Sequence, residues 1–343
     1  MWMAATPIRL SQHHIATLHT LLPRVVDGDI DGVHDARVVT RRLRELLPLT
    51  LEWLGSDAVD GLTTRFRRIG RALGTVRDAD VRLTMLEYLE ARVPNAAPSL
   101  IIVRQACERD RLTRLRRMIK RLERLEVGHS LEEAVETLSA PRLSFIGRAW
   151  RRQLGRTVGD RARDAHESIE HATGVFFPNR LHRARIALKK LRYAAEIVAL
   201  TGRDGLRDAV RDLRKAQDIL GDVRDRQLLI EQLPKWVTPD WPQVDAGHVR
   251  LATQVMDAEC HELHARYLAR RSRLVEICDH AHRPLDGRRM AAAAPKVAAG
   301  AIALTSAVYA WHRLREQEPQ PGGSSRVLSV RIPIDVPSTA PGK

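Results

Sequence analysis

Two short segments of this 343-residue chain recur at nearly the same spacing, and this repeat constrains the fold more than any other feature. VHDARVVTRRLR at residues 33–44 matches LHRARIALKKLR at residues 181–192, an offset of 148. LGTVRD at residues 73–78 matches LGDVRD at residues 220–225, an offset of 147. The two matches predict a tandem duplication whose halves meet near residues 135–145. Duplicated helical halves commonly pack about a pseudo-twofold axis, so a groove or channel along that axis would be lined by both.

The hydrophobic pattern predicts an all-α fold of two duplicated antiparallel helical bundles. Long segments rich in Leu, Ala, Arg and Glu follow the helical period, and no alternating run of β-branched residues interrupts them before the far C-terminus. Breaks are expected at clusters of Gly, Pro and Asn. Helices are therefore predicted at residues 8–25, 31–54, 57–73, 78–92, 98–126, 141–172, 179–201, 205–220, 225–236 and 243–282.

The chain is predicted to contain one helical domain over residues 8–285, with halves at about 8–140 and 141–285. Residues 286–315 are expected to form an apolar C-terminal helix that packs on the body or on a partner. Its apolar stretch is interrupted by Pro295 and Lys296 and is too short to span a bilayer, so we expect no firm membrane association. Residues 316–343 have the composition of a disordered tail. The N-terminus lacks a secretory signal and the three cysteines are scattered, which predicts a cytoplasmic location.

The charge of the chain indicates an anionic partner. Lys and Arg number 57 against 42 Asp and Glu, a net charge of +15, and arginine supplies nearly all of the positive charge. The planar guanidinium pairs with phosphate oxygens in a bidentate way, so an arginine-rich surface suits phosphate in particular. Nucleic acid, an anionic membrane and polyphosphate all fit this charge. Aromatic residues are only 4% of the chain, which disfavours stacking on unpaired bases.

Each copy of the longer repeat carries basic side chains along one face of a predicted helix. Four positions spaced i, i+3, i+7 and i+10 fall within about 80° of arc. In the first copy, here called the first stripe, they are His34, Arg37, Arg41 and Arg44. In the second copy, the second stripe, they are His182, Arg185, Lys189 and Arg192. We expect the two stripes to face each other across one basic cavity; the alternative is a solvated or salt-bridged helix face.

Small and apolar residues are predicted to back each stripe on the opposite side of its helix. Behind the first stripe these are Ala36, Val39, Thr40, Leu43, Leu46 and Leu47, and behind the second Ala184, Ala187, Leu188, Leu191 and Ala195. A second rail of basic pairs is expected on the following helices, unless these side chains pair with surface carboxylates. The pairs are Arg67 with Arg68 and, at an offset of 147, Arg214 with Lys215.

The LGxVRD segments are interpreted as turns between helices. In this interpretation the glycines end a helix and the aspartates cap or charge the first turn of the next one. The glycines are Gly74 and Gly221, and the aspartates are Asp78 and Asp225. The arginines between them, Arg77 and Arg224, either hold those turns or reach a ligand.

Taken with the duplication, the repeated segments resemble the CHAD (conserved histidine α-helical domain) family, whose halves each carry the pattern His-x-x-Arg-x-x-x-Arg/Lys-Arg/Lys-x-Arg. The resemblance covers about residues 8–285. It implies two helical bundles around a basic channel, binding of inorganic polyphosphate and, often, recruitment to polyphosphate granules. The implied binding residues are those of the two stripes together with Arg42 and Lys190. The role of Arg42 and Lys190 rests on the resemblance, because both lie about 120° from the centre of their stripe.

We therefore expect a non-catalytic polyphosphate-binding protein without cofactor or metal; the main alternative is a sequence-independent nucleic-acid-binding protein. The Glu-x-Glu-x-Lys motif of the triphosphate-processing domain that often accompanies this family does not occur, and neither does a Walker-type phosphate loop. Two histidine-rich segments, Cys260-His261-x-x-His264 and Cys278-x-His280-x-His282, have no carboxylate in firm ligand spacing. They are interpreted as helix surface.

Overall fold

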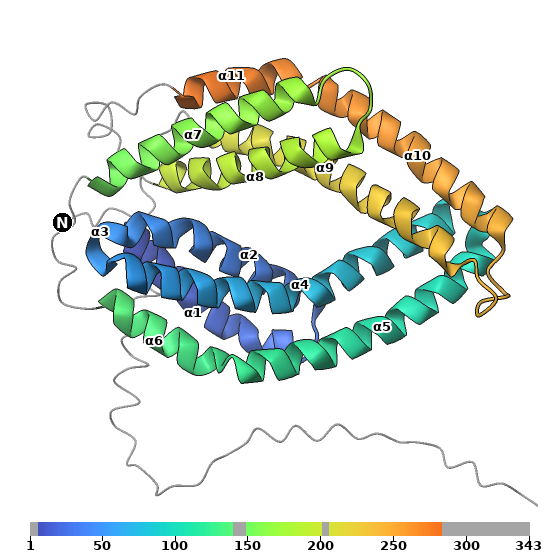
Figure 1. Ribbon diagram of the computed structural model, residues 1–343, viewed down its shortest axis with the longest axis horizontal. Helices are drawn as coiled ribbons and strands as arrows, with labels where there is room; N and C mark the ends of the chain where they lie inside the picture. The colour runs from blue at the N-terminus through green and yellow to red at the C-terminus, as the bar shows by residue number, and fades with distance from the viewer. Residues whose placement is uncertain (1–5, 140–148, 201–205, 283–343) are drawn as a thin grey trace, which may run out of the picture. The chain divides into compact units, whose positions relative to one another are not determined.

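The computed structural model of the protein describes residues 6–139, 149–200 and 206–282, and every secondary-structure element in these ranges is helical (Figure 1). This confirms the all-α prediction for the described residues. The α-helices are α1 (Pro7–Val26), α2 (Ile30–Leu46), α3 (Leu51–Leu54), α4 (Ser56–Arg92), α5 (Ala97–Arg124), α6 (Val127–Ser139), α7 (Ala149–His171), α8 (Pro178–Leu200), α9 (Arg207–Gln232), α10 (Ala246–Leu268) and α11 (Arg271–His282). Short 3-10 helices are η1 (Leu47–Thr50), η2 (Pro94–Ala96) and η5 (Leu233–Trp236).

The described residues belong to one compact unit, Met1–Pro295. The predicted apolar helix at 286–315 and the predicted tail at 316–343 lie outside the described residues. So does most of the predicted junction between the halves, because residues 140–148 are not described. None of the helices in the described ranges has both the length and the apolar character needed to cross a membrane.

The helices fall into two sets with the same order of neighbours. In the first set α1 packs on α2, α2 on α4, α4 on α5, and α6 returns to α1. In the second set α7 packs on α8, α8 on α9, α9 on α10, and α11 returns to α7. Figure 1 shows one set above the other, with α4 and α5 running to the same end of the unit as α9 and α10.

Three hydrophobic cores hold these helices together. One core lies within the first set and contains Leu18, Phe66 and Ile69. Another lies mainly within the second set, although Leu46 and Leu49 of the first half join it. The third, here called the shared core, takes side chains from both sets where α4, α5, α9 and α10 meet. Its buried members are Leu86, Leu89, Val93, Ala96, Leu100, Val103, Cys107, Leu229, Leu233, Val244, Val249, Ala252 and Met256.

Helix α2 is amphipathic in the way that the first repeat predicts, whereas α8 is buried on one face as far as Lys190 and on all sides from Leu191 to Ala195. All eleven residues predicted to back the stripes are buried. Helix α2 begins where Gly28, with a φ of +74°, turns the chain and the Asp29 carboxylate accepts a hydrogen bond from the Gly32 amide. The stripe residues other than Arg192 keep part of their surface accessible. The burial of one face therefore fixes which face presents the cations.

The predicted helix ends at Gly74 and Gly221 are wrong, because both glycines lie inside the long helices α4 and α9. Leu73 and Val76 are buried on either side of Gly74, and Leu220 and Val223 flank Gly221 in the same way. Burial of four such side chains outweighs the cost of about 1 kcal/mol for each glycine in a helix interior. Asp78 and Asp225 are consequently not helix caps.

Three other predicted boundaries also differ. The predicted helix at 31–54 ends at Leu46, and the chain then tightens into η1 at a proline and passes through α3 to Gly55, whose φ is +79°. The predicted helix at 98–126 ends at Arg124, where Glu126 adopts a φ of 45° and α6 follows. The single helix predicted at 243–282 is two helices, α10 and α11. Each difference is a local turn within a stretch of uninterrupted helical periodicity.

Candidate functional site

The first stripe and the second stripe meet where α2 packs against α8. Arg41 Nη1 donates a hydrogen bond to the hydroxyl of Tyr193 at 3.1 Å, and its guanidinium carbon lies 5.9 Å from the centre of that ring. Tyr193 is buried directly after Arg192, so it anchors the first stripe to the helix that carries the second. This contact joins residues that are 152 positions apart in the chain.

Lys189 of the second stripe lies among cations from both stripes. Its pKa is lowered from 10.5 to about 7, first by burial and then by the charges of Arg41, Arg185 and Arg37. Arg41 also acts on Arg185, whose pKa is lowered mainly by burial. Because such effects fall off with distance, the cations of the two stripes share one region. Mutual repulsion there disfavours the charged form of the lysine.

The guanidinium of Arg37 packs against the side of α4, at a position here called its seat. Its Nη1 donates to the Gly70 carbonyl at 3.1 Å, and its Nη2 lies 4.0 Å from an Asp78 carboxylate oxygen. A Cβ atom on Gly74 would lie 2.2 Å from Nη1, so the missing side chain makes room for the guanidinium. The LGxVRD segment thus provides a glycine under the arginine and a carboxylate beside it.

Arg185 lies in the corresponding place on α9. Its guanidinium nitrogens lie 3.9 and 4.0 Å from the position that a Cβ on Gly221 would take. The charge of Asp225 is the largest effect that favours the charged form of Arg185 by raising its pKa. Within the described ranges, the buried Arg185 Nε and His182 Nδ1 have no hydrogen-bond partner. An unpaired buried polar atom is costly, so an anion that accepted a hydrogen bond here would relieve a penalty of about 1–3 kcal/mol.

The histidines begin the stripes next to the LGxVRD arginines. Burial lowers the pKa of His34, and the charge of Arg77 lowers it further. Burial lowers the pKa of His182 too, followed by the charges of Arg224, Arg185 and Lys189. Arg77 also acts on Asp225 of the other set. Of the two roles considered for Arg77 and Arg224, the structure therefore favours a place beside the stripes over a place in a turn.

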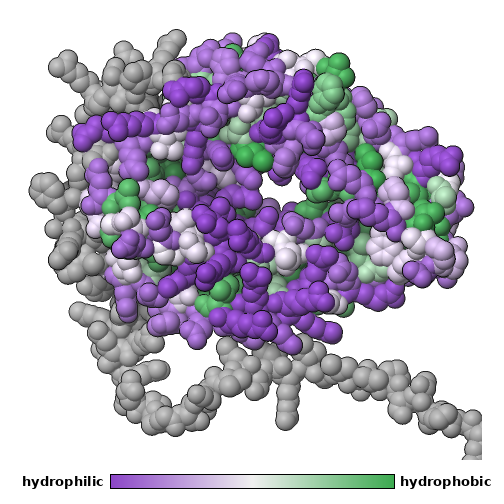
Figure 2. All heavy atoms as spheres, in the orientation of Figure 1, coloured by the Kyte–Doolittle hydropathy of each residue, from purple (hydrophilic) through white to green (hydrophobic). Residues whose placement is uncertain are grey.

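Figure 2, drawn in the orientation of Figure 1, shows an opening through the described unit. Hydrophilic side chains line much of its rim. In Figure 1 the same place lies between α4 and α9, the helices that carry the LGxVRD segments. The stripe helices α2 and α8 pack on α4 and α9 respectively, so the stripes lie beside the helices that border this opening.

The other predicted site residues lie in two surroundings. Arg42, Arg192 and Arg214 converge on one carboxylate, that of Glu196. The remaining residues are solvent-exposed, and the pKa of Arg44 is lowered by partial burial and then by Arg67. These exposed residues are Arg44, Arg67, Arg68, Lys190 and Lys215. The structure therefore brings together the residues near the stripe centres and leaves the second rail on the surface.

Three residues that contact the stripes or their neighbours were not predicted from the sequence. Tyr193 receives Arg41, Glu45 pairs with Arg161 of α7, and Glu196 gathers three arginines. A carboxylate four residues after Arg192 was a usable signal, because i and i+4 side chains meet on a helix. Nothing in the repeat marks Tyr193, since the corresponding residue of the first copy is Glu45.

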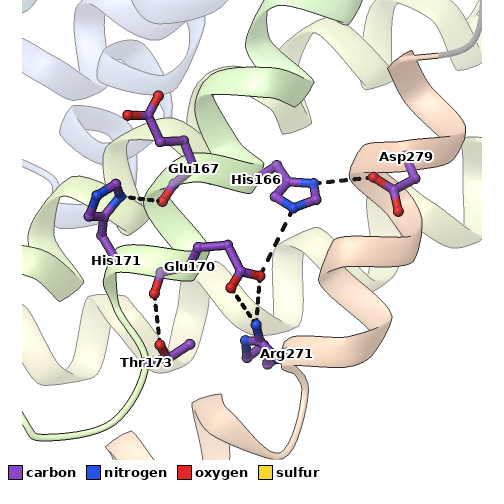
Figure 3. Close-up of polar contacts among 7 residues, drawn as sticks. All are labelled: His166, Glu167, Glu170, His171, Thr173, Arg271 and Asp279. Atoms are coloured by element: carbon purple, nitrogen blue, oxygen red, sulfur yellow. Dashed lines mark hydrogen bonds and ion pairs between the residues drawn. The ribbon is translucent and has the colours of Figure 1, made fainter.

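The histidine-rich segments near the C-terminal end of the described residues are partly helix surface, since His261 and His280 are exposed, and partly packed in the interior. His264 and Cys260 are buried, and the His264 ring lies 5.5 Å from that of Phe176. Figure 3 shows a neighbouring polar cluster in which His166 of α7 lies 3.1 Å from Asp279 of α11, and Arg271 pairs with Glu170. No group of three His, Cys, Asp or Glu side chains in the described ranges is placed to hold a metal ion.

Fold and site together define an all-helical domain whose two sets of helices bring cationic side chains into one region. The profile of the CHAD domain family matches residues 9–234. The chain belongs to the CHAD domain family.

The chain is similar in sequence to two curated proteins. Two uncharacterised proteins of Mycobacterium tuberculosis, MT2285 of strain CDC 1551 and Rv2226 of strain H37Rv, are each 29% identical over 238 residues. The match covers 62% of this chain and 42% of each relative, so the chain spans less than half the length of the curated relatives it matches.

Two solved structures share the fold. The CHAD domain from the plant Ricinus communis is 21% identical, with a TM-score of 0.56 over 82% of this chain and 93% of that one. PptA from Streptomyces chartreusis is 18% identical, with a TM-score of 0.50 over 81% of this chain and 97% of that one.

Proposed function

We propose that this protein binds inorganic polyphosphate without turning it over, through the cations of the two stripes. The observation that carries the proposal is the convergence of Arg37, Arg41 and Arg185 around Lys189. Like charges gathered in one partly buried region raise the free energy of the folded protein unless an anion neutralises them. Membership of the CHAD domain family agrees with a polyphosphate-related function.

The geometry of the stripes favours a linear anion. Each stripe extends for about 15 Å along its helix, and the cations repeat along that length. We further propose that the two sets of helices arose by duplication and face the bound chain about a pseudo-twofold axis, which the matching order of helix neighbours supports. In the cell the protein would then lie in the cytoplasm, at polyphosphate granules.

A pure binding role agrees with the kinds of groups near the stripes. The stripes supply hydrogen-bond donors and cations, while Asp78 lies beside Arg37 and Asp225 beside Arg185. Carboxylates held in this way position arginines and are poorly placed to activate water. We expect no sustained release of orthophosphate from polyphosphate by the purified protein. Release that one stripe substitution abolished would contradict the binding role.

Sequence-independent binding of nucleic acid is the second candidate, because neutralising a phosphate backbone needs only basic surface. The exposed arginines of α5 supply such surface. A competition experiment separates the two candidates. If polyphosphate is the ligand, long polyphosphate should displace nucleic acid at a lower concentration, expressed per phosphate. Displacement at equal phosphate concentrations would favour a general affinity for polyanions.

The decisive experiment compares two quadruple variants with equal changes of net charge. In the first, Arg37, Arg41, Arg185 and Lys189 are replaced by Gln. In the second, four exposed arginines of α5 are replaced by Gln, namely Arg109, Arg116, Arg117 and Arg121. Charge-assisted contacts hold phosphate strongly, so the stripe variant should lose at least about 4 kcal/mol of binding free energy, roughly a thousandfold in affinity.

Salt dependence adds a second readout to that comparison. Losing about four phosphate contacts should flatten the dependence of log affinity on log salt by roughly three units, if single-strand behaviour transfers. The α5 variant should keep most of the slope, because a diffuse field beyond about 8–10 Å is screened. Circular dichroism checks that both variants stay helical. Equal losses and equal slopes would remove the stripes from the site.

A further inference from the structure

One carboxylate occupies the middle of a cluster of three arginines that come from three helices. Glu196 of α8 pairs with Arg192 on its own helix, and the same oxygen lies 3.4 Å from Arg214 Nη2 of α9. Its other oxygen lies 3.9 Å from Arg42 Nη2 of α2, which belongs to the first set of helices. The Glu196 side chain is 16% exposed. Three positive charges thus surround one negative charge, which leaves an excess of two.

The three arginines are not held equally. Arg192 is fixed, because its Nε donates to Gln217 Oε1 at 2.8 Å and its guanidinium lies 4.4 Å from the centre of the Tyr193 ring. Among the described residues, Arg42 and Arg214 meet Glu196 at the longer distances of 3.9 and 3.4 Å, and their side chains are 40% and 59% exposed. They are therefore free to turn toward another anion while Arg192 keeps its place.

The matching end of the first stripe has different surroundings. Arg44 is the counterpart of Arg192, and the position matching Glu196 is Pro48. Arg44 is exposed, and within the described ranges no carboxylate lies within ion-pair distance of it. Its strongest charged neighbour is Arg67. The first stripe thus ends in an exposed arginine without a nearby carboxylate. The second stripe ends in arginines whose charge Glu196 partly neutralises.

We propose that Glu196 is an internal competitor for phosphate, which holds Arg42 and Arg214 until a phosphate group of the bound chain displaces it from them. A carboxylate and a phosphate accept the same charge-assisted hydrogen bonds from guanidinium groups. The carboxylate therefore lowers the affinity of this end of the site for polyphosphate. This inference rests on the proposed function, since it assigns an affinity-determining residue to the same site.

The test is Glu196→Gln in the full chain, titrated with polyphosphate of one defined length at several salt concentrations. The Gln oxygen still accepts a hydrogen bond from Arg192, but the negative charge is gone. Binding should tighten several-fold at each salt concentration, because a phosphate group no longer has to displace a carboxylate from Arg42 and Arg214. Adding Arg42→Gln and Arg214→Gln to this variant should abolish that gain.

Asp212→Asn is the matched control, because it also removes one carboxylate charge from a side chain that is 19% exposed. Asp212 lies on α9 and accepts from Arg273 of α11 at 3.1 Å. It should leave the affinity for polyphosphate nearly unchanged. Equal tightening by both variants would overturn the proposal in favour of net charge alone. Weaker binding by a folded Glu196→Gln variant would overturn it too, because Glu196 would then position the arginines for the ligand.

The same titrations separate this inference from the proposed function. The isotherm of the unchanged protein tests whether polyphosphate binds at all, and the ratio between variant and unchanged protein tests Glu196. Thermal melts followed by circular dichroism check the fold. If Glu196→Gln unfolds, Arg42→Gln with Arg214→Gln replaces it. That pair should then weaken binding less than Arg41→Gln with Lys189→Gln, and an equal loss would count against competition by Glu196.

Discussion

Gly74 carries no side chain at the point where Arg37 lies against α4. A methyl group there would lie 2.2 Å from Arg37 Nη1, so Gly74→Ala must push the guanidinium out of its seat. The displaced atoms are the far end of a flexible side chain, and alanine favours a helix over glycine by about 1 kcal/mol. We expect Gly74→Ala to weaken polyphosphate binding about tenfold or more without lowering the melting temperature.

Gly221→Ala is the control for that substitution. The guanidinium of Arg185 lies 3.9 to 4.0 Å from the new methyl group, an ordinary van der Waals distance. This variant should bind polyphosphate nearly as well as the unchanged protein and should be as stable or slightly more so. Isotherms and thermal melts of the two variants decide the point. Similar affinities for both would show that the seat on α4 does not matter for binding.

Lys189 is expected to make polyphosphate binding depend on pH. Its pKa of about 7 reflects burial and the charges of Arg41, Arg185 and Arg37, and a bound polyanion raises that pKa again. Binding at pH 8 should therefore take up close to one proton, and affinity should fall as the pH rises above about 7. Calorimetry in two buffers of different ionisation enthalpy measures the uptake. Lys189→Arg keeps its charge at this pH and should abolish most of it.

The lowered pKa of Lys189 also predicts how the free energy of unfolding changes with pH. The pKa of Lys189 is about 7 in the folded protein, below its ordinary value of 10.5, so between these values the unfolded chain binds more protons. Stability from this group therefore rises with pH across that window, and its full penalty is present below pH 7. Lys189→Met should stabilise the protein more at pH 6 than at pH 10 in denaturant titrations. A pH-independent effect would mean that packing, and not charge, is responsible.

At the scale of the elements, periodicity predicted the faces of the helices better than their ends. The buried residues behind both stripes follow from a spacing that each helix carries within itself. Gly74 and Gly221 were misread because a glycine marks either a helix end or a close approach, and only the helix packed against it decides between them. The close approach of Arg37 comes from α2, which lies 37 positions earlier in the chain.

Contacts between the two sets of helices could not be predicted from the sequence for a related reason. The pairing of Arg41 with Tyr193, and of Arg42 with Glu196, links residues that no helical spacing relates. The repeat placed cations on corresponding helices, yet it gave no register between α2 and α8. Residues that differ between the copies, such as Glu45 and Tyr193, or Pro48 and Glu196, therefore carry the asymmetry of the site.

At the scale of the whole unit, the shared core determines whether the two sets of helices are independent. Helices α4 and α5 contribute Leu86, Leu89 and Leu100, while α9 and α10 contribute Leu229 and Met256. Neither set can bury these side chains alone. The hydrogen bonds that Glu259 accepts from Tyr88 and Arg226 add a polar link between α4, α9 and α10. The two sets of helices thus form one folding unit, in which each set depends on the other to bury this core.

This dependence predicts the outcome of Met256→Ala. Met256 is fully buried in the shared core, so its truncation should cost about 2–5 kcal/mol of unfolding free energy. Because both sets need that core, urea unfolding should remain one transition at a lower midpoint, with circular dichroism and tryptophan fluorescence changing together. Leu112→Ala on α5 is the control, since Leu112 is 51% exposed and should matter by less than about 0.5 kcal/mol. Two separate transitions, with only one shifted, would mean that each set of helices folds without the other.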